Sequence, residues 1–277
     1  MIFRSSISKM VVFVFLIFGI QQVAHSFSVH DSLKKMIPSL FKQQPLRAPR
    51  IALITINDDI NFFQVSQHLV DIAKNPTFDG AILIINNNGG SLGSFSVIHD
   101  LIKKVSKTKP IVAVVGQGAL SCGYLIASVT QYIFAHTLSD IGGIGVILQV
   151  NRYKQMKIKE NDLEADMQVN LLYAGEFKVD THVFAKDLSD EQKKGLQDNL
   201  NFSYNQIVTM VAENRNLKRD AYKEWAEGKK FLAPRALELG LIDQIGTIFD
   251  AEEKVREFVV KKNPQAVYGP GVTVINL

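Results

Sequence analysis

Apolar residues in this chain fall into short continuous runs separated by segments of helical spacing. The run RIALITI at 50–56 is rich in β-branched residues and has the length of a strand. The segment at 61–76 carries apolar residues at helical spacing and ends at a proline. The same pattern predicts strands at 80–86, 110–116, 131–136 and 142–150, and helices at 94–108 and 121–130.

Strands that are apolar throughout, and that alternate with helices, indicate an α/β fold. Such strands are typical of a largely parallel sheet that is covered on both faces. From about residue 151 the chain becomes more polar, and 189–216 reads as one helix that starts with a capping box of Ser189 and Gln192. Further helices are expected at 218–227, 233–239 and 249–262, with a last strand at 272–277. We therefore expect one domain with a helical C-terminal portion.

The N-terminal residues have the pattern of an export signal. Arg4 and Lys9 precede an eleven-residue apolar run, and small residues at Ala24 and Ser26 follow. A helix that spans a membrane needs about 20 apolar residues, whereas a signal peptide core needs about 7 to 15. Residues 1–26 are therefore interpreted as a signal peptide or an N-terminal membrane anchor, with a buried helix as the alternative.

Charge and cysteine content exclude several classes of function. The net charge is +4, and the basic pairs are scattered along the chain, which argues against a nucleic-acid-binding face. Cys122 is the only cysteine in the sequence, so no disulfide within the chain and no cysteine-based metal site can form. A lone cysteine is usually a small buried hydrophobe. We expect neither a metal nor a cofactor.

The segment INNNGGSLG at 85–93 lies between a predicted strand and a predicted helix. Paired glycines allow backbone N–H groups to face a cleft, where they can bind a phosphate or a developing oxyanion. The dinucleotide and P-loop patterns are both absent, so phosphate is the less favoured ligand. The alternative is a tight turn that needs positive φ angles.

Ser121 follows the strand at 110–116 and the loop at 117–120, and it precedes a helix. In this position the serine is either a nucleophile or a helix N-cap. A serine nucleophile needs a base, and none of the six histidines lies in a motif that pairs with it. His99 is followed by Asp100, but adjacent residues on a helix are not expected to face each other.

Lys178 follows the aromatic and apolar stretch LLYAGEF at 171–177. Burial disfavours the charged form of a lysine and lowers its pKa, and a neutral amine can then act as a general base. The alternative is a surface lysine whose stem covers apolar residues.

Together these segments resemble the S49 serine peptidases, the signal peptide peptidase A family, in a single-copy short form. The family turn Asn-Ser-Pro-Gly-Gly is matched by NNNGG at 86–90. The nucleophile motif Ala-Ala-Ser-Gly-Gly-Tyr is matched by ALSCGY at 119–124, and Ser-Gly-Lys-Tyr-Lys-Asp by AGEFKV at 174–179. PRALELGLIDQIG at 234–246 is similar to the family's C-terminal helix and turn. The resemblance implies the Clp protease and crotonase fold, with repeated ββα units.

The resemblance also implies roles for individual residues. Ser121 would be the nucleophile and Lys178 the base of a Ser/Lys dyad, and backbone N–H groups of Gly89, Gly90 and Cys122 would form the oxyanion hole. Where the family carries a serine that positions the lysine, this chain has Gly143, and Ser139 is the candidate substitute.

By resemblance, the chain would be a serine endopeptidase that cleaves remnant signal peptides or other short hydrophobic peptides at the membrane. It would form a homo-oligomeric ring and lie on the outer face of a bacterial inner membrane or in the periplasm. The alternatives are a catalytically weakened relative that binds peptides or acts as a scaffold, and an acyl-CoA enzyme, against which the export signal argues. The expected parts are the N-terminal segment 1–26, a linker at 27–49, a peptidase domain at 50–262 and a tail at 263–277.

Overall fold

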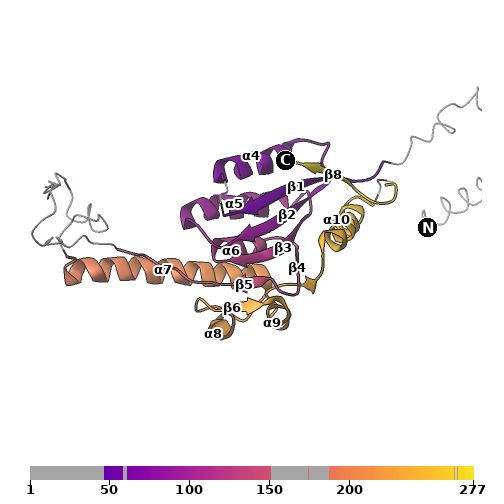
Figure 1. The fold of residues 1–277 in the computed structure, drawn as a ribbon. Coiled ribbons are helices and arrows are strands. Elements are labelled where there is room, and N and C mark those ends of the chain that lie inside the picture. Colours follow the sequence, from indigo (N-terminus) through magenta and orange to yellow (C-terminus); the bar gives the residue numbers. More distant parts are fainter. Residues whose placement is uncertain (1–46, 59–60, 151–173, 175–186, 265, 267) are drawn as a thin grey trace, which may run out of the picture. The chain divides into compact units, whose positions relative to one another are not determined.

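Parallel strands with helices packed around them form the centre of the unit at residues 48–277 (Figure 1). The computed structural model describes residues 47–58, 61–150, 174, 187–264, 266 and 268–277, and residues 48–277 form one compact unit. Within these residues one sheet has the strand order β6-β5-β3-β2-β1-β8, and β4 pairs with β3 and β7. Its strands are β1 (Arg50–Asn57), β2 (Gly80–Asn87), β3 (Ile111–Leu120), β4 (Tyr132–Ala135), β5 (Asp140–Gly142), β6 (Lys230–Leu232), β7 (Gln244–Ile245) and β8 (Thr273–Asn276).

All strand pairs are parallel except β5 with β6. The predicted α/β class with a largely parallel sheet is therefore confirmed. The last strand, β8, lies in the segment expected to be a tail, and it extends the sheet beside β1.

The helices agree closely with the periodicity of the sequence. The capping box of Ser189 and Gln192 is present at the start of the long helix, as predicted. That helix ends at Asn216, which adopts a left-handed conformation. The α-helices in the described part are α4 (Phe62–Lys74), α5 (Leu92–Val105), α6 (Cys122–Ser128), α7 (Asp190–Arg215), α8 (Tyr222–Trp225), α9 (Ala233–Glu238) and α10 (Ile248–Lys262).

Apolar cores lie on both faces of the sheet because neighbouring strand residues point to opposite faces. Ile51, Ile82 and Val112 pack with residues of α10 on one face. Their neighbours Ala52, Leu83 and Ala113 belong to the larger core, which also contains residues of α4, α5, α6 and α7. Full burial on both faces explains why these strands are apolar throughout.

Two predicted boundaries are wrong. The loop expected at 117–120 is the last part of β3, because residues 118–120 pair with β5. The strand expected at 142–150 is not formed: β5 spans Asp140–Gly142, and residues 143–150 are not in a strand. Gly142 and Gly143 have φ angles of 108° and 61°, and this left-handed backbone interrupts a strand despite the apolar residues that follow.

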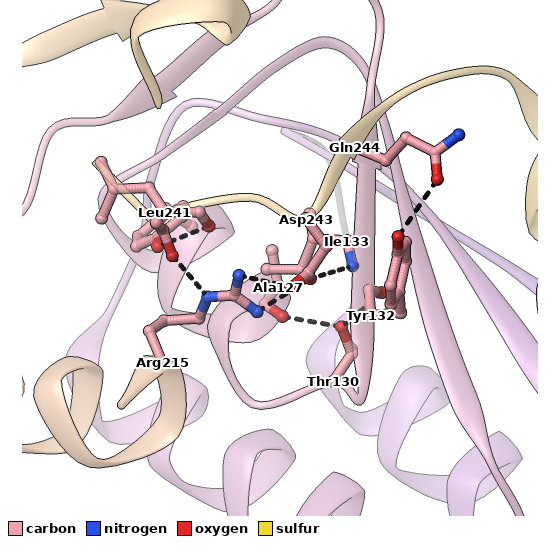
Figure 2. A network of polar contacts seen from close by, with 10 residues as sticks. Ala127, Thr130, Tyr132, Ile133, Arg215, Leu241, Asp243 and Gln244 are labelled. Atoms are coloured by element: carbon pink, nitrogen blue, oxygen red, sulfur yellow. Dashed lines mark hydrogen bonds and ion pairs between the residues drawn. The ribbon is translucent and has the colours of Figure 1, made fainter. Parts of the chain in front are cut away.

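A partly buried ion pair connects the end of α7 to the sheet (Figure 2). The guanidinium of Arg215 donates two hydrogen bonds to the carboxylate of Asp243, at 3.0 and 2.9 Å, and a third to the carbonyl oxygen of Gly240. Asp243 also accepts a hydrogen bond from the N–H of Ile133 in β4. This network fixes the part of α7 that packs on the core.

Residues 1–46, with the predicted export segment, lie outside the described residues. Within the described residues, no helix combines the length and apolar character needed to cross a membrane.

Candidate active site

Ser121 occupies a strained turn between β3 and α6. Its φ and ψ angles are 51° and −122°, a conformation that few residues other than glycine adopt. Its N–H donates to the carbonyl oxygen of Gly142 at 2.8 Å, and its own carbonyl oxygen accepts from the N–H of Leu125 at 3.0 Å. The hydroxyl makes no capping hydrogen bond to α6. The geometry is therefore that of a side chain presented at a sharp turn from strand to helix.

Gly89 packs directly against this serine. A Cβ at Gly89 would lie 3.1 Å from the Cβ of Ser121 and 3.4 Å from its Oγ. The φ angle of Gly89 is 142°, which side chains rarely adopt. Both observations require glycine here, so the turn after β2 forms one wall around the Ser121 hydroxyl.

Gly143 lies on the other side of Ser121. A Cβ at Gly143 would lie 3.2 Å from the backbone nitrogen of Ser121. The N–H of Gly143 donates to the carbonyl oxygen of Lys229 at 2.7 Å, which anchors this turn to the residue before β6. The ends of three parallel strands, β2, β3 and β5, therefore meet at Ser121, as expected for sites in open α/β sheets.

Cys122, the residue after the serine, is buried, as expected for a lone cysteine that acts as a small hydrophobic residue. Its Sγ donates a hydrogen bond to the carbonyl oxygen of Gly90 at 3.2 Å. Burial raises the pKa of this thiol, and hydrogen bonds with the Ser121 side chain and the Gly90 backbone act in the opposite direction. The cysteine thus connects the serine turn to the glycine turn while its thiol stays protonated.

The three residues predicted for the oxyanion hole differ in their hydrogen bonds. The N–H of Gly89 donates to Oδ1 of Asn87 at 3.1 Å. The N–H of Cys122 belongs to the first turn of α6, where backbone N–H groups lack partners within the helix. Gly90 is held beside Cys122 through its carbonyl oxygen. Their role in stabilising an oxyanion stays a prediction.

Each of the three asparagines at the end of β2 binds a different partner. Oδ1 of Asn86 accepts from the N–H of Gln117 at 2.7 Å, and Nδ2 of Asn87 donates to the carbonyl oxygen of Asn57 at 2.9 Å. Asp58 accepts two hydrogen bonds from Asn88, one from its N–H at 2.6 Å and one from its Nδ2 at 2.7 Å. These bonds lower the pKa of Asp58. Asp58 was not among the residues predicted for the site, although its position directly after β1, which pairs with β2, could have indicated it.

Lys178 lies outside the described residues, so its pairing with Ser121 stays a prediction. Ser139, proposed to position the lysine, is buried. Its hydroxyl contacts the carbonyl oxygens of Val115, at 3.3 Å, and of Gly116. The side chain thus binds the backbone of β3, and its relation to Lys178 also stays a prediction.

The described histidines show one contact that was not expected. Nδ1 of His99 lies 3.1 Å from Oδ1 of Asp100, although adjacent helical residues were expected to point apart. Because an ionised carboxylate only accepts, Nδ1 is the donor in this contact, and Nε2 of the same ring lies 3.2 Å from Nδ2 of Asn214. His99 is buried in this network and belongs to the core packing. Among the described residues no cluster of potential metal ligands is found.

A pocket of about 470 Å³ is lined in part by the segment that follows Gly143. It begins two residues after Gly143, and its walls come from the segment after β5, from α7 and from the turn before β6. Glu227 in that turn has a φ angle of 61°, and its carboxylate accepts a 2.7 Å hydrogen bond from the hydroxyl of Tyr204. The lining residues are Gly145, Val146, Ile147, Leu148, Gln197, Leu200, Asn201, Tyr204, Glu227 and Gly228.

The fold and this turn define an α/β protein with a serine presented where parallel strands end. The model of peptidase family S49 matches residues 103–261, which is more than half of the chain. The chain belongs to peptidase family S49.

Three relatives illustrate how far the similarity extends. A protein of Methanocaldococcus jannaschii, named as an inferred protease, is 29% identical over 202 residues, which is 73% of this chain and 63% of that protein. A protein of Enterococcus faecium, named as an inferred signal peptide peptidase SppA, is 30% identical over 68% of this chain and 54% of its own length. Protease 4 of Haemophilus influenzae is 27% identical over 67% of this chain and 29% of its own length. The chain thus spans less than two thirds of the length of these relatives.

Proposed function

We propose that this protein is a serine endopeptidase that uses Ser121 and Lys178 as a catalytic dyad. The observation that carries the proposal is the strained backbone of Ser121, with φ 51° and ψ −122°. Strain of this kind costs about 1 to 3 kcal/mol, and it concentrates at active sites, where the surrounding structure enforces it. Because the chain belongs to peptidase family S49, we infer that the strained turn presents the Ser121 hydroxyl as the nucleophile.

In the proposed reaction, Oγ of Ser121 attacks the carbonyl carbon of a peptide bond while neutral Lys178 removes the hydroxyl proton. The carbonyl oxygen becomes an oxyanion, and backbone N–H groups at the glycine turn and at Cys122 stabilise it. Lys178 then gives the proton to the leaving amine, and water hydrolyses the acyl-enzyme. Ser139 can still accept a hydrogen bond from Lys178, because a hydroxyl that donates to a carbonyl keeps lone pairs.

The proposed substrates are short hydrophobic peptides, including signal peptides released near a membrane. The name of the Enterococcus faecium relative supports this substrate class. The pocket near Gly143 also supports it, since Val146 and Leu200 supply apolar walls for a substrate side chain. Export or membrane anchoring through residues 1–26, and assembly into a homo-oligomeric ring, belong to the same proposal.

A second candidate is a peptide-binding relative with weakened catalysis. One observation favours it: the N–H of Gly89, a predicted oxyanion donor, is already bonded to Asn87. Under this reading the site would hold peptides without cutting them.

Cleavage of a synthetic signal peptide separates the two candidates. The full chain should cut the peptide, and Ser121→Ala and Lys178→Ala should each lose activity by at least about 10³-fold while folding normally. Ser96→Ala and Lys193→Ala are matched controls, since the Ser96 hydroxyl bonds within α5 and Lys193 pairs with Asp190 at the start of α7. Peptide that binds to the wild type and stays intact would favour the binding protein instead.

A further inference from the structure

We propose that Asp58 is a positioning residue that holds the glycine turn against Ser121, an inference that rests on the proposed peptidase function. Asp58 lies directly after β1, and the turn it binds follows β2. Its two carboxylate oxygens receive the N–H and the Nδ2 group of the same residue, Asn88. We call this pair the Asp58–Asn88 clamp.

The clamp constrains the part of the turn that faces the serine. Asn88 is followed immediately by Gly89, whose Cα lies so close to Ser121 that a Cβ would be 3.1 Å from the serine Cβ. Hydrogen bonds to a charged carboxylate are among the stronger ones in proteins, and both oxygens here are used. Movement of Asn88 would therefore displace the glycine N–H groups relative to the Ser121 hydroxyl.

Asn57 and Asn87 add a second link between the same two strand ends. Nδ2 of Asn87 donates to the carbonyl oxygen of Asn57 at 2.9 Å, and its Oδ1 accepts from the N–H of Gly89. The turn is thus held from β1 by two consecutive residues. Asn87 is buried, whereas Asp58 and Asn88 are exposed, so the clamp can be altered without opening the core.

The clamp depends on the identity of residue 88, because Asp58 accepts a hydrogen bond from the backbone N–H of that residue. The motif that this turn resembles has proline in this place, and proline has no N–H to donate. Proline would instead fix the φ angle of the turn directly. In this chain the carboxylate of Asp58 restricts the backbone of the turn instead, by binding the N–H and the side chain of Asn88. This explains why the turn tolerates asparagine in place of proline.

A double-mutant cycle with Asp58→Ala and Asn88→Pro tests the proposal. Asp58→Ala removes both carboxylate oxygens that accept hydrogen bonds from Asn88, whereas an asparagine at this position could still bind the rotated amide of Asn88. We expect kcat for peptide cleavage to fall about 10- to 100-fold, because small displacements of catalytic groups have effects of this size. KM should stay unchanged, because Asp58 is not among the residues that line the pocket, and the unfolding midpoint should fall only slightly, because Asp58 is exposed. In the Asn88→Pro background, Asp58→Ala should have no further effect on kcat.

The backbone of Asn87 suits this test, because it is the last residue of an extended strand and residues before proline favour extended conformations. Asp71→Ala is the matched control: Asp71 is also an exposed aspartate that accepts an amide hydrogen bond, from Gln67 within α4. It should leave kcat at the wild-type value.

Amide hydrogen exchange of a fragment covering 84–95 gives a readout that does not depend on catalysis. Exchange at Gly89 and Gly90 should become faster in Asp58→Ala and stay at the wild-type rate in Asp71→Ala. Unchanged exchange, or an unchanged kcat with faster exchange, would overturn the positioning role while leaving the peptidase function intact. If the wild type is as inactive as Ser121→Ala, the proposed function is wrong, and so is the catalytic part of this inference. Hydrogen exchange would then still decide whether the clamp orders the turn.

Discussion

The backbone N–H of Ser121 donates a hydrogen bond to the carbonyl oxygen of Gly142 at 2.8 Å. This bond joins the end of β3 to the end of β5 at the residue with the most unusual backbone of the site. The glycine turn after β2 approaches the same serine from the other side. The strain at Ser121 is therefore enforced by two neighbouring strands, which is what a preorganised nucleophile requires.

Gly123→Ala should disturb the spacing between the serine turn and the glycine turn. A Cβ at this position would lie 2.4 Å from the carbonyl oxygen of Asn87, so the backbone at one of the two sites must move. We expect a loss of about 1 to 3 kcal/mol in the free energy of unfolding, typical of overpacking, together with a loss of peptide cleavage. Chemical denaturation and a cleavage assay measure the two effects.

Gly195→Ala provides the control for that substitution. A Cβ at Gly195 in α7 would meet nothing within 4 Å. Alanine in a helix interior is more stable than glycine by about 0.5 to 1 kcal/mol. The variant should therefore be slightly more stable than the wild type and equally active. Equal losses in both alanine variants would show that the contact with Asn87 is not the cause.

Arg215→Ala should destabilise the protein strongly. The side chains of Arg215 and Asp243 are 7% and 27% exposed, and Asp243 would be left without its cation beside β4. Because the pair is partly buried and carries several charge-assisted hydrogen bonds, we expect a loss of about 1.5 to 3 kcal/mol in the free energy of unfolding, less than for a fully buried pair. Arg235→Ala removes an exposed pair with Glu238, which should cost at most about 1 kcal/mol. Similar unfolding midpoints for the two variants would contradict the structural role of the Arg215 network.

High pH should weaken the contact between α7 and the turn before β6. Burial, together with the neighbouring Glu227 side chain, raises the pKa of Tyr204 from 10.0 to about 12. A raised pKa means that the folded state holds the proton more tightly than the unfolded state, so this contribution to stability is present below pH 10 and declines as the pH rises toward 12. Tyr204→Phe should make the decline of stability across this range shallower. A decline of the same slope in both proteins would exclude Tyr204 as a contributor.

Sequence reasoning was most successful where side-chain periodicity alone determines structure. The apolar strands, the helix at 189–216 and its capping box depend on local patterns, and the structure confirms them. The pattern failed after Gly142, because two glycines with positive φ angles end β5 although the next residues are apolar. It also failed at 117–120, where polar and small residues form strand because they pair with β5.

In the candidate site, too, residues in local motifs could be predicted, whereas a residue that depends on a distant contact could not. The serine, the glycines and Cys122 could be singled out because they lie in motifs with recognisable spacing, and the structure brings them together, while their catalytic roles stay predictions. Asp58 was missed because its role depends on contact with Asn88, thirty residues away in the sequence. Contacts of this kind follow from the register of β1 with β2, which no local pattern specifies.

Reaction of the full chain with an alkyl fluorophosphonate, followed by mass spectrometry of the adduct, tests the central claim most directly. The account predicts a single adduct on Ser121 of the wild type, no adduct in Ser121→Ala, and labelling slowed by at least about 10²-fold in Lys178→Ala because the base is missing. Labelling of Ser121 at the wild-type rate in Lys178→Ala, or a wild type that cuts peptides while Ser121 stays unmodified, would contradict it.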